Sequence, residues 1–88
     1  MTCSDQITVP QDDSLHLRPM QVLVENASAF ECKIVVGRGG KLVDAKSIFD
    51  VMMLATQKGP LTVEAEGNDA DEAVRTIVRL LNNELNRG

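Results

Sequence analysis

A single apolar stripe in the last quarter of the chain constrains the fold more than any other feature. Its residues recur at spacings of three and four, which is typical of one face of an α-helix. A capping pair, Asp69 and Glu72, is predicted to begin this helix, which is expected to end near Gly88. A helix with one apolar face must bury that face against a second layer of structure. The stripe consists of Ala70, Ala73, Val74, Ile77, Val78, Leu81 and Leu85.

Four upstream segments are predicted to supply that second layer as a sheet. Apolar and polar residues alternate over 6–9, 31–36 and 61–66, as they do in a strand with one buried face. A glycine-rich turn over 37–40 leads into a short strand over 41–44, so a hairpin is predicted in the middle of the chain. Because the chain has two Phe and no Trp or Tyr, we expect an aliphatic core.

Two further helices are predicted between the strands. Apolar residues spaced three and four apart predict a helix over 17–29, where Pro19 fits the first turn because its missing N–H costs nothing there. A shorter helix is predicted over 47–54, with Ser47 as its N-cap. The element order is therefore β-α-β-β-α-β-α. We expect a single α+β domain over 1–88, an open-faced two-layer sandwich in which three helices cover one face of a four-stranded, mostly antiparallel sheet.

Charge and composition argue against several classes of function. The formal net charge is −4 and aromatic residues are scarce, so the chain offers nucleic acid neither a basic field nor stacking platforms. Its apolar runs are far shorter than the roughly 20 residues that span a bilayer. No basic and apolar leader opens the chain, so a cytoplasmic protein without a membrane partner is expected. Cys3 and Cys32 lack metal-binding spacing and are predicted to be free thiols.

The single histidine, His16, lies between a polar loop and the predicted start of the first helix. An imidazole is partly uncharged near neutral pH and can attack phosphorus. A phosphoryl group on the ring would lie against unpaired backbone N–H groups and the positive end of the helix dipole. Arg18 adds a guanidinium whose forked donors suit phosphate oxygens. From spacing alone the alternative stays open that His16 is a surface histidine without a chemical role.

Ser47 is a second candidate site, because an apolar group follows it at the start of the short helix. Phosphorylation of its hydroxyl would add about −1.5 to −2 charges beside that group and would switch the docking of a partner. The simpler alternative is that Ser47 serves only as an N-cap. The apolar group consists of Ile48, Phe49, Met52 and Met53.

Two short motifs lie at a characteristic distance from each other. Leu15-His16-x-Arg18-Pro19 is followed about thirty residues later by Ala45-Lys46-Ser47-Ile48. Together they resemble the motifs of the HPr family of the phosphoenolpyruvate-dependent phosphotransferase system. The likeness continues through Ala65-Glu66-Gly67 and the last helix, so it covers essentially the whole chain as one HPr-like domain. The predicted element order is also that of the family.

The resemblance implies a phosphocarrier rather than a stand-alone enzyme. It implies that Enzyme I phosphorylates His16 from phosphoenolpyruvate, that Arg18 assists, and that the group passes to the A component (EIIA) of a sugar permease. Ser47 corresponds to the serine that HPr kinase/phosphorylase modifies in bacteria with that enzyme, which lowers acceptance at His16. A monomer without metal or cofactor is expected. The partner-binding residues are expected to be Leu17, Met20, Ile48, Phe49 and Met52.

Around the predicted site, the chain departs from the family pattern in the size of several side chains and in their charge. Ser14, Leu17 and Met20 stand where the family usually has smaller residues, which makes the rim of the site bulkier. Because charge complementarity sets encounter rates and partner choice, the loss of lysines is expected to weaken docking to acidic surfaces and to favour a divergent partner set. Nearby carboxylates are also expected to slow phosphate acceptance. The acidic residues are Asp12 and Asp13 before the histidine, and Glu25 and Asp50 where many members carry Lys.

Two alternatives to sugar transport remain at this point. A protein of the family's nitrogen-related branch would use the same phosphoryl chemistry for regulation. A regulatory binding module would leave His16 silent and would dock regulators or enzymes through the apolar group under the control of Ser47. The joint presence of His16, Arg18 and Pro19 argues against the second alternative.

Overall fold

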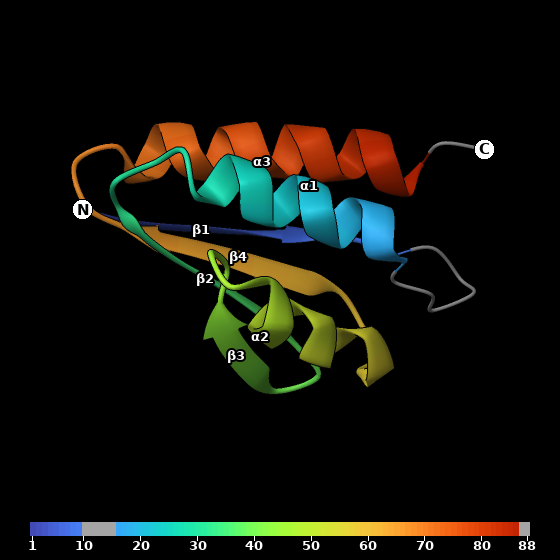
Figure 1. Cartoon of the computed structure of the whole chain (residues 1–88). Helices are drawn as coiled ribbons and strands as arrows, with labels where there is room; N and C mark the ends of the chain where they lie inside the picture. The colour runs from blue at the N-terminus through green and yellow to red at the C-terminus, as the bar shows by residue number, and fades with distance from the viewer. Residues whose placement is uncertain (10–15, 87–88) are drawn as a thin grey trace.

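Four antiparallel strands form one sheet in the computed structural model, which describes residues 1–9 and 16–86. Their order in the sheet is β1-β4-β2-β3, so the first and last strands of the sequence pair in full, from Thr2 opposite Glu66 to Ile7 opposite Leu61 (Figure 1). The two central strands also pair antiparallel, and β2 continues into a hairpin with β3. The strands are β1 Thr2–Ile7, β2 Lys33–Arg38, β3 Lys41–Asp44 and β4 Leu61–Glu66.

The helices cover one face of this sheet (Figure 1). Helix α1, Leu17–Ala27, and helix α3, Ala70–Leu85, lie side by side across it. A short helix α2, Ile48–Met52, continues into a 3-10 turn η1, Met53–Thr56, and packs against α1 and β3. The predicted α+β architecture, an open-faced two-layer sandwich, is therefore confirmed.

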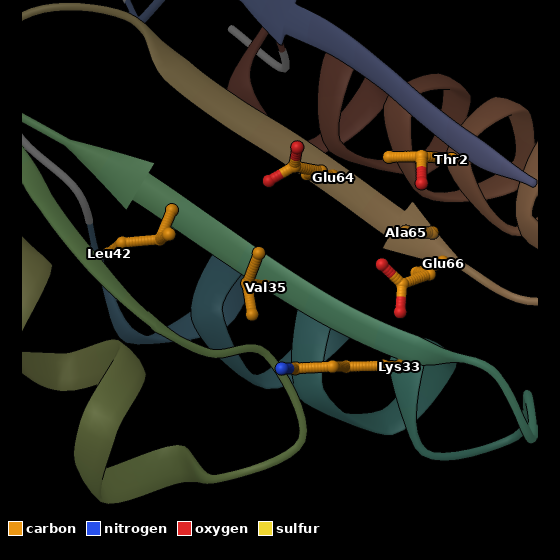
Figure 2. A pocket seen from close by; sticks show the side chains of 7 residues that line it. All are labelled: Thr2, Lys33, Val35, Leu42, Glu64, Ala65 and Glu66. Atoms are coloured by element: carbon orange, nitrogen blue, oxygen red, sulfur yellow. The ribbon is translucent and has the colours of Figure 1, made fainter.

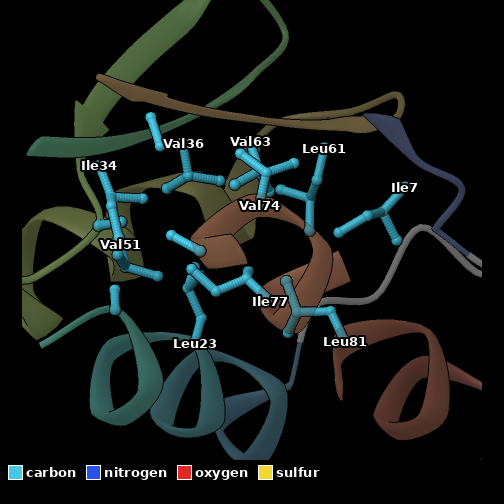
Figure 3. Packing of buried hydrophobic residues seen from close by; sticks show 14 of the residues in the cluster. Ile7, Leu23, Ile34, Val36, Val51, Leu61, Val63, Val74, Ile77 and Leu81 are labelled. Carbon is cyan, nitrogen blue, oxygen red and sulfur yellow. The ribbon is translucent and has the colours of Figure 1, made fainter. Parts of the chain in front are cut away.

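The core lies between the sheet and the helices and is aliphatic, as predicted (Figure 3). Alternate residues of β2 and β4 point toward the helices because successive side chains of a strand alternate between its faces. Helices α1 and α3 meet them with the apolar stripes that the sequence predicts. The side chains that fill the centre include Leu23, Ile34, Val36, Leu61, Val63, Ile77 and Leu81.

The opposite face of the sheet carries no helix in the part of the chain that the structure describes. Glu64 and Glu66 of β4 lie on it, beside Lys33 and Val35 of β2 (Figure 2). The charged outer face predicted for this strand is therefore present. Leu42 of β3 covers Gly37, where an added Cβ would lie only 2.9 Å from the Leu42 Cδ1 atom.

Several predicted strand boundaries were wrong. The first strand covers Thr2–Ile7 and not 6–9, because this edge strand is defined by its pairing with β4 and its exposed residues show no apolar alternation. The second strand begins at Lys33, so Cys32 is buried just before it. The turn of the hairpin is confined to Gly39 and Gly40, which have φ of 60° and 83°.

Helix boundaries also differ from prediction. Helix α1 ends at Ala27, and the predicted helix over 47–54 divides into α2 and η1. Asp69 is the N-cap residue of α3 but its side chain makes no capping hydrogen bond. Burial raises the pKa of the Cys32 thiol, and the nearby Asp69 carboxylate raises it further. Both cysteines are free, as predicted.

Arg38 at the end of β2 was predicted to lie in a turn, and it is instead buried, with 2% of its surface exposed. Its guanidinium donates hydrogen bonds from Nε to the Gly59 carbonyl at 2.9 Å and from Nη1 to the Leu54 carbonyl at 3.3 Å. The Leu54 carbonyl in η1 also accepts from the Gln57 N–H, and Gly59 lies in the segment after η1. Arg38 therefore joins the hairpin to the end of η1 and fixes the α2–η1 segment.

Candidate functional site

His16 is the N-cap residue of α1 and its imidazole is exposed. Its backbone is extended, with φ −75° and ψ 164°, and its side chain makes no capping hydrogen bond to the helix. The residue lines a shallow, open depression on the surface together with Arg18, Pro19 and Glu84. The structure therefore brings the two predicted catalytic residues together and adds a carboxylate from α3.

The first turn of α1 is suited to hold an anion. The backbone N–H groups of Leu17 and Arg18 have no partner within the helix, since the first N–H groups of any α-helix lack a carbonyl four residues before them. Pro19 has no N–H to leave unpaired and is itself buried. No acidic residue lies in this turn, so nothing in it opposes the positive end of the helix dipole.

Arg18 forms an ion pair with Glu84, with 3.2 Å between Arg18 Nε and Glu84 Oε1. The Arg18 side chain is 69% exposed and that of Glu84 is 11% exposed. The carboxylate therefore holds one edge of the guanidinium, while other N–H donors of the same group face solvent. Sequence reasoning missed Glu84, because 66 positions separate it from Arg18 and only the packing of α3 beside α1 brings them together.

Ser47 lies at the start of α2, where its side chain is the N-cap, as predicted. Its Oγ accepts a hydrogen bond from the Asp50 N–H at 3.4 Å, which is a long bond. Asp50 lies in the first turn of the same helix and thus complements the positive end of its dipole. Ser47 is half-buried and does not line the depression at His16.

An apolar patch of Phe49, Met52 and Met53 is exposed on α2 and η1, and Phe49 has 78% of its surface accessible. Leu17, at the start of the neighbouring helix α1, is also exposed, whereas Ile48 is half-buried against the core. Exposed apolar groups of this kind mark interaction surfaces. Met53 belongs to the apolar group predicted after Ser47, although the resemblance did not imply it among the partner-binding residues.

Met20 was expected to contact partners, and this prediction was wrong. Its side chain is 5% exposed and belongs to the core cluster. The cause is its position on the apolar stripe of α1, which faces the sheet. Ser14, Asp12 and Asp13, which were expected to shape the rim of the site, lie outside the described residues.

Among residues 1–9 and 16–86, no three His, Cys, Asp or Glu side chains are grouped so that they could hold a metal ion. None of the helices described is both long and apolar enough to cross a bilayer.

Comparisons with known proteins agree with this fold. The family model described as "PTS HPr component phosphorylation site" matches residues 3–83. The chain is 40% identical over 85 residues to the phosphocarrier protein HPr of Pseudomonas aeruginosa, which covers 94% of each chain. It is 38% identical over 79 residues to the HPr of Haemophilus influenzae, covering 89% of this chain and 93% of the relative.

A solved structure extends the likeness to three dimensions. The histidine-containing phosphocarrier protein of Mycoplasma superposes with a TM-score of 0.83 at 33% identity, covering 98% of this chain and 100% of that one. Similarity of sequence and of structure thus extends over nearly the whole length, including the segment around His16. The chain belongs to the HPr family of phosphocarrier proteins of the phosphotransferase system.

Proposed function

We propose that His16 accepts a phosphoryl group from phosphorylated Enzyme I and passes it to the A component (EIIA) of a sugar permease. The observation that carries this proposal is the shared depression, where an exposed imidazole at the start of α1 lies beside the guanidinium of Arg18. His16 is therefore accessible to a docked protein and next to groups that stabilise an anion. The site is open and shallow, as in-line transfer between two proteins requires.

In the first transfer, an unprotonated ring nitrogen of His16 attacks phosphorus. A P–N bond to His16 forms while the bond between phosphorus and the donor breaks, and the donor keeps that electron pair. In the second transfer, the acceptor attacks the same phosphorus, and the electron pair of the P–N bond returns to the imidazole. No oxidation, metal or cofactor enters either step.

The charge on the transferred group is stabilised by what surrounds it. The N–H groups of Leu17 and Arg18 and the dipole of α1 attract phosphate oxygens, as helix N-termini commonly do. The Arg18 guanidinium supplies charge-assisted hydrogen bonds from the donors that Glu84 does not occupy. Because these groups lie at the surface, the phosphoryl group is held without being enclosed, and it stays available to the acceptor.

The test is phosphoryl transfer in vitro. The purified protein is incubated with phosphoenolpyruvate and the Enzyme I of the same organism, and its intact mass is measured at mildly alkaline pH. We expect one acid-labile phosphoryl group on the wild type, none on His16→Ala, and onward transfer from the wild type to EIIA. If His16→Ala gains the same group, or if the wild type gains none, His16 is not the acceptor.

We further propose that Ser47 is a regulatory phosphorylation site. Ser47 lies two residues before Phe49 at the start of the same helix, so a phosphate there would place a dianion close to the apolar patch. Incubation with ATP and an HPr kinase/phosphorylase is expected to modify the wild type but not Ser47→Ala. The modified protein should accept the phosphoryl group on His16 more slowly. Unchanged acceptance after complete modification would contradict this role.

A further inference from the structure

Two carboxylates and one guanidinium lie on the two helical segments around the apolar patch of Phe49, Met52 and Met53. The exposed surface around it is built from α1 with its cap residues and from the α2–η1 segment, residues 16–28 and 47–56. Besides His16, these two stretches contain only three charged residues. They are Arg18, Glu25 and Asp50.

Two of the positive charges nearest to this surface bond to other groups of the chain. Arg18 is paired with Glu84 on α3. Lys46, directly before Ser47, is half-buried and donates from Nζ to the Phe30 carbonyl at 2.6 Å. Lys58 lies beyond η1 and lines a groove with residues of the β2–β3 hairpin.

The negative charges are differently placed. Glu25 is exposed on α1. Asp50 adjoins Phe49 and takes part in no ion pair within 1–9 and 16–86, and the same holds for Glu25. The Asp50 carboxylate therefore lies close to the apolar patch without an ion-pair partner among the described residues. Glu25 lies seven residues after Arg18 and hence on the same side of α1 as Arg18.

We propose that this surface docks a protein whose apolar socket is edged by lysine or arginine residues. The inference rests on the proposed phosphocarrier function and specifies the partner's chemistry. Opposite charges at the rim of an interface speed association, and like charges slow it. A partner edged by carboxylates would face Glu25 and Asp50 with the same sign of charge. The transfer partners of this chain are therefore expected to carry basic rims.

Charge reversal at single positions tests the sign of this complementarity. The second-order rate of phosphoryl transfer from the Enzyme I of the same organism is measured for the wild type, Glu25→Lys and Asp50→Lys, at low and at high salt. We expect each reversal to lower the rate about three- to tenfold at low salt, with the loss disappearing near 1 M salt, where charges are screened over about 3 Å.

Two controls separate docking from net charge and from folding. Asp71→Lys makes the same change of charge on α3, away from the patch, and should transfer at nearly the wild-type rate. Asp50→Asn, which removes the charge without reversing it, should fall between the wild type and Asp50→Lys. Circular dichroism confirms that each variant is folded before its rate is compared.

The outcomes distinguish this inference from the function on which it rests. If Asp50→Lys and Glu25→Lys transfer as fast as the wild type or faster, while His16 is still phosphorylated, the basic-rim partner is excluded and the phosphocarrier function stands. The basic-rim partner is also excluded if these two variants lose no more of the transfer rate than Asp71→Lys does and the loss is the same at low and at high salt. If wild-type His16 accepts nothing, both proposals fall.

Discussion

Helices α1 and α2 begin in opposite ways, although each starts at a residue that the sequence singles out for phosphorylation. Helix α1 begins at His16, whose side chain makes no capping bond, and its first turn contains no acid. Helix α2 begins at Ser47, whose hydroxyl caps the Asp50 N–H, and Asp50 supplies a carboxylate in the first turn. The first turn of α2 thus contains a carboxylate, whereas the first turn of α1 contains none.

The start of α1 is therefore suited to receive a phosphate, whereas the start of α2 is already stabilised by groups of the chain itself. A phosphoryl group at His16 meets N–H donors and Arg18, so the helix gains an anion that it lacks. A phosphate at Ser47 would replace the existing cap and lie close to the Asp50 carboxylate, which repels it. We therefore expect modification at His16 to be electrostatically easier than modification at Ser47.

The largest effect is expected from Arg18→Ala, which removes the cation from the α1 site. Charge-assisted hydrogen bonds contribute about 1.5–3 kcal/mol, so phosphoryl acceptance should fall about 10- to 100-fold. Quench-flow measurement of transfer from Enzyme I gives this rate. Arg75→Ala is the matched control, because Arg75 is also exposed and paired, to Asp71 at 3.1 Å, but lies on α3. Equal acceptance rates for the two variants would show that Arg18 does not stabilise the transferred phosphoryl group.

Ser47→Ala tests the other helix, where the side chain is expected to matter for stability and not for acceptance. Loss of an N-cap costs about 1 kcal/mol of unfolding free energy. In a domain of this size that corresponds to a fall in Tm of about 4–8 °C. Thermal unfolding followed by circular dichroism measures it. Wild-type stability in Ser47→Ala would mean that the long bond to the Asp50 N–H contributes nothing.

His16→Asp turns the start of α1 into one that resembles α2. The backbone at His16 is already extended, as an N-cap requires, so a carboxylate there can accept from the Arg18 N–H. We expect the free energy of unfolding to rise by about 0.5–1 kcal/mol relative to His16→Ala, with acceptance abolished in both. Urea unfolding measures the difference. A less stable His16→Asp would show that this helix start does not favour an anion.

The contrast between these helices was predictable in part. Local signals, such as Ser47 before an apolar helix and Pro19 in a first turn, correctly predicted the start of both helices. The strands over 41–44 and 61–66 were correct to the residue, since a positive-φ glycine pair and strict alternation define them locally. These features depend on neighbours within a few positions.

What could not be predicted depends on distant partners. Arg38 is buried because carbonyls 16 and 21 positions later accept its hydrogen bonds, and no local pattern indicates them. Glu84 reaches Arg18 only through the packing of α3 on α1. Met20 was assigned to both the core stripe and the partner surface, and the structure leaves it in the core.

Glu84→Gln sharpens the comparison by removing the carboxylate that α3 brings to the α1 site. The pair with Arg18 is exposed on the arginine side, so its loss should change stability by only a few tenths of a kcal/mol. Acceptance at His16 should rise about two- to fivefold, because Glu84 competes with phosphate for the guanidinium and repels it. The hydrolysis half-life of the phosphorylated protein should lengthen in parallel. If acceptance falls instead, Glu84 acts by orienting Arg18 toward His16, and this effect on acceptance is larger than the repulsion between the Glu84 carboxylate and phosphate.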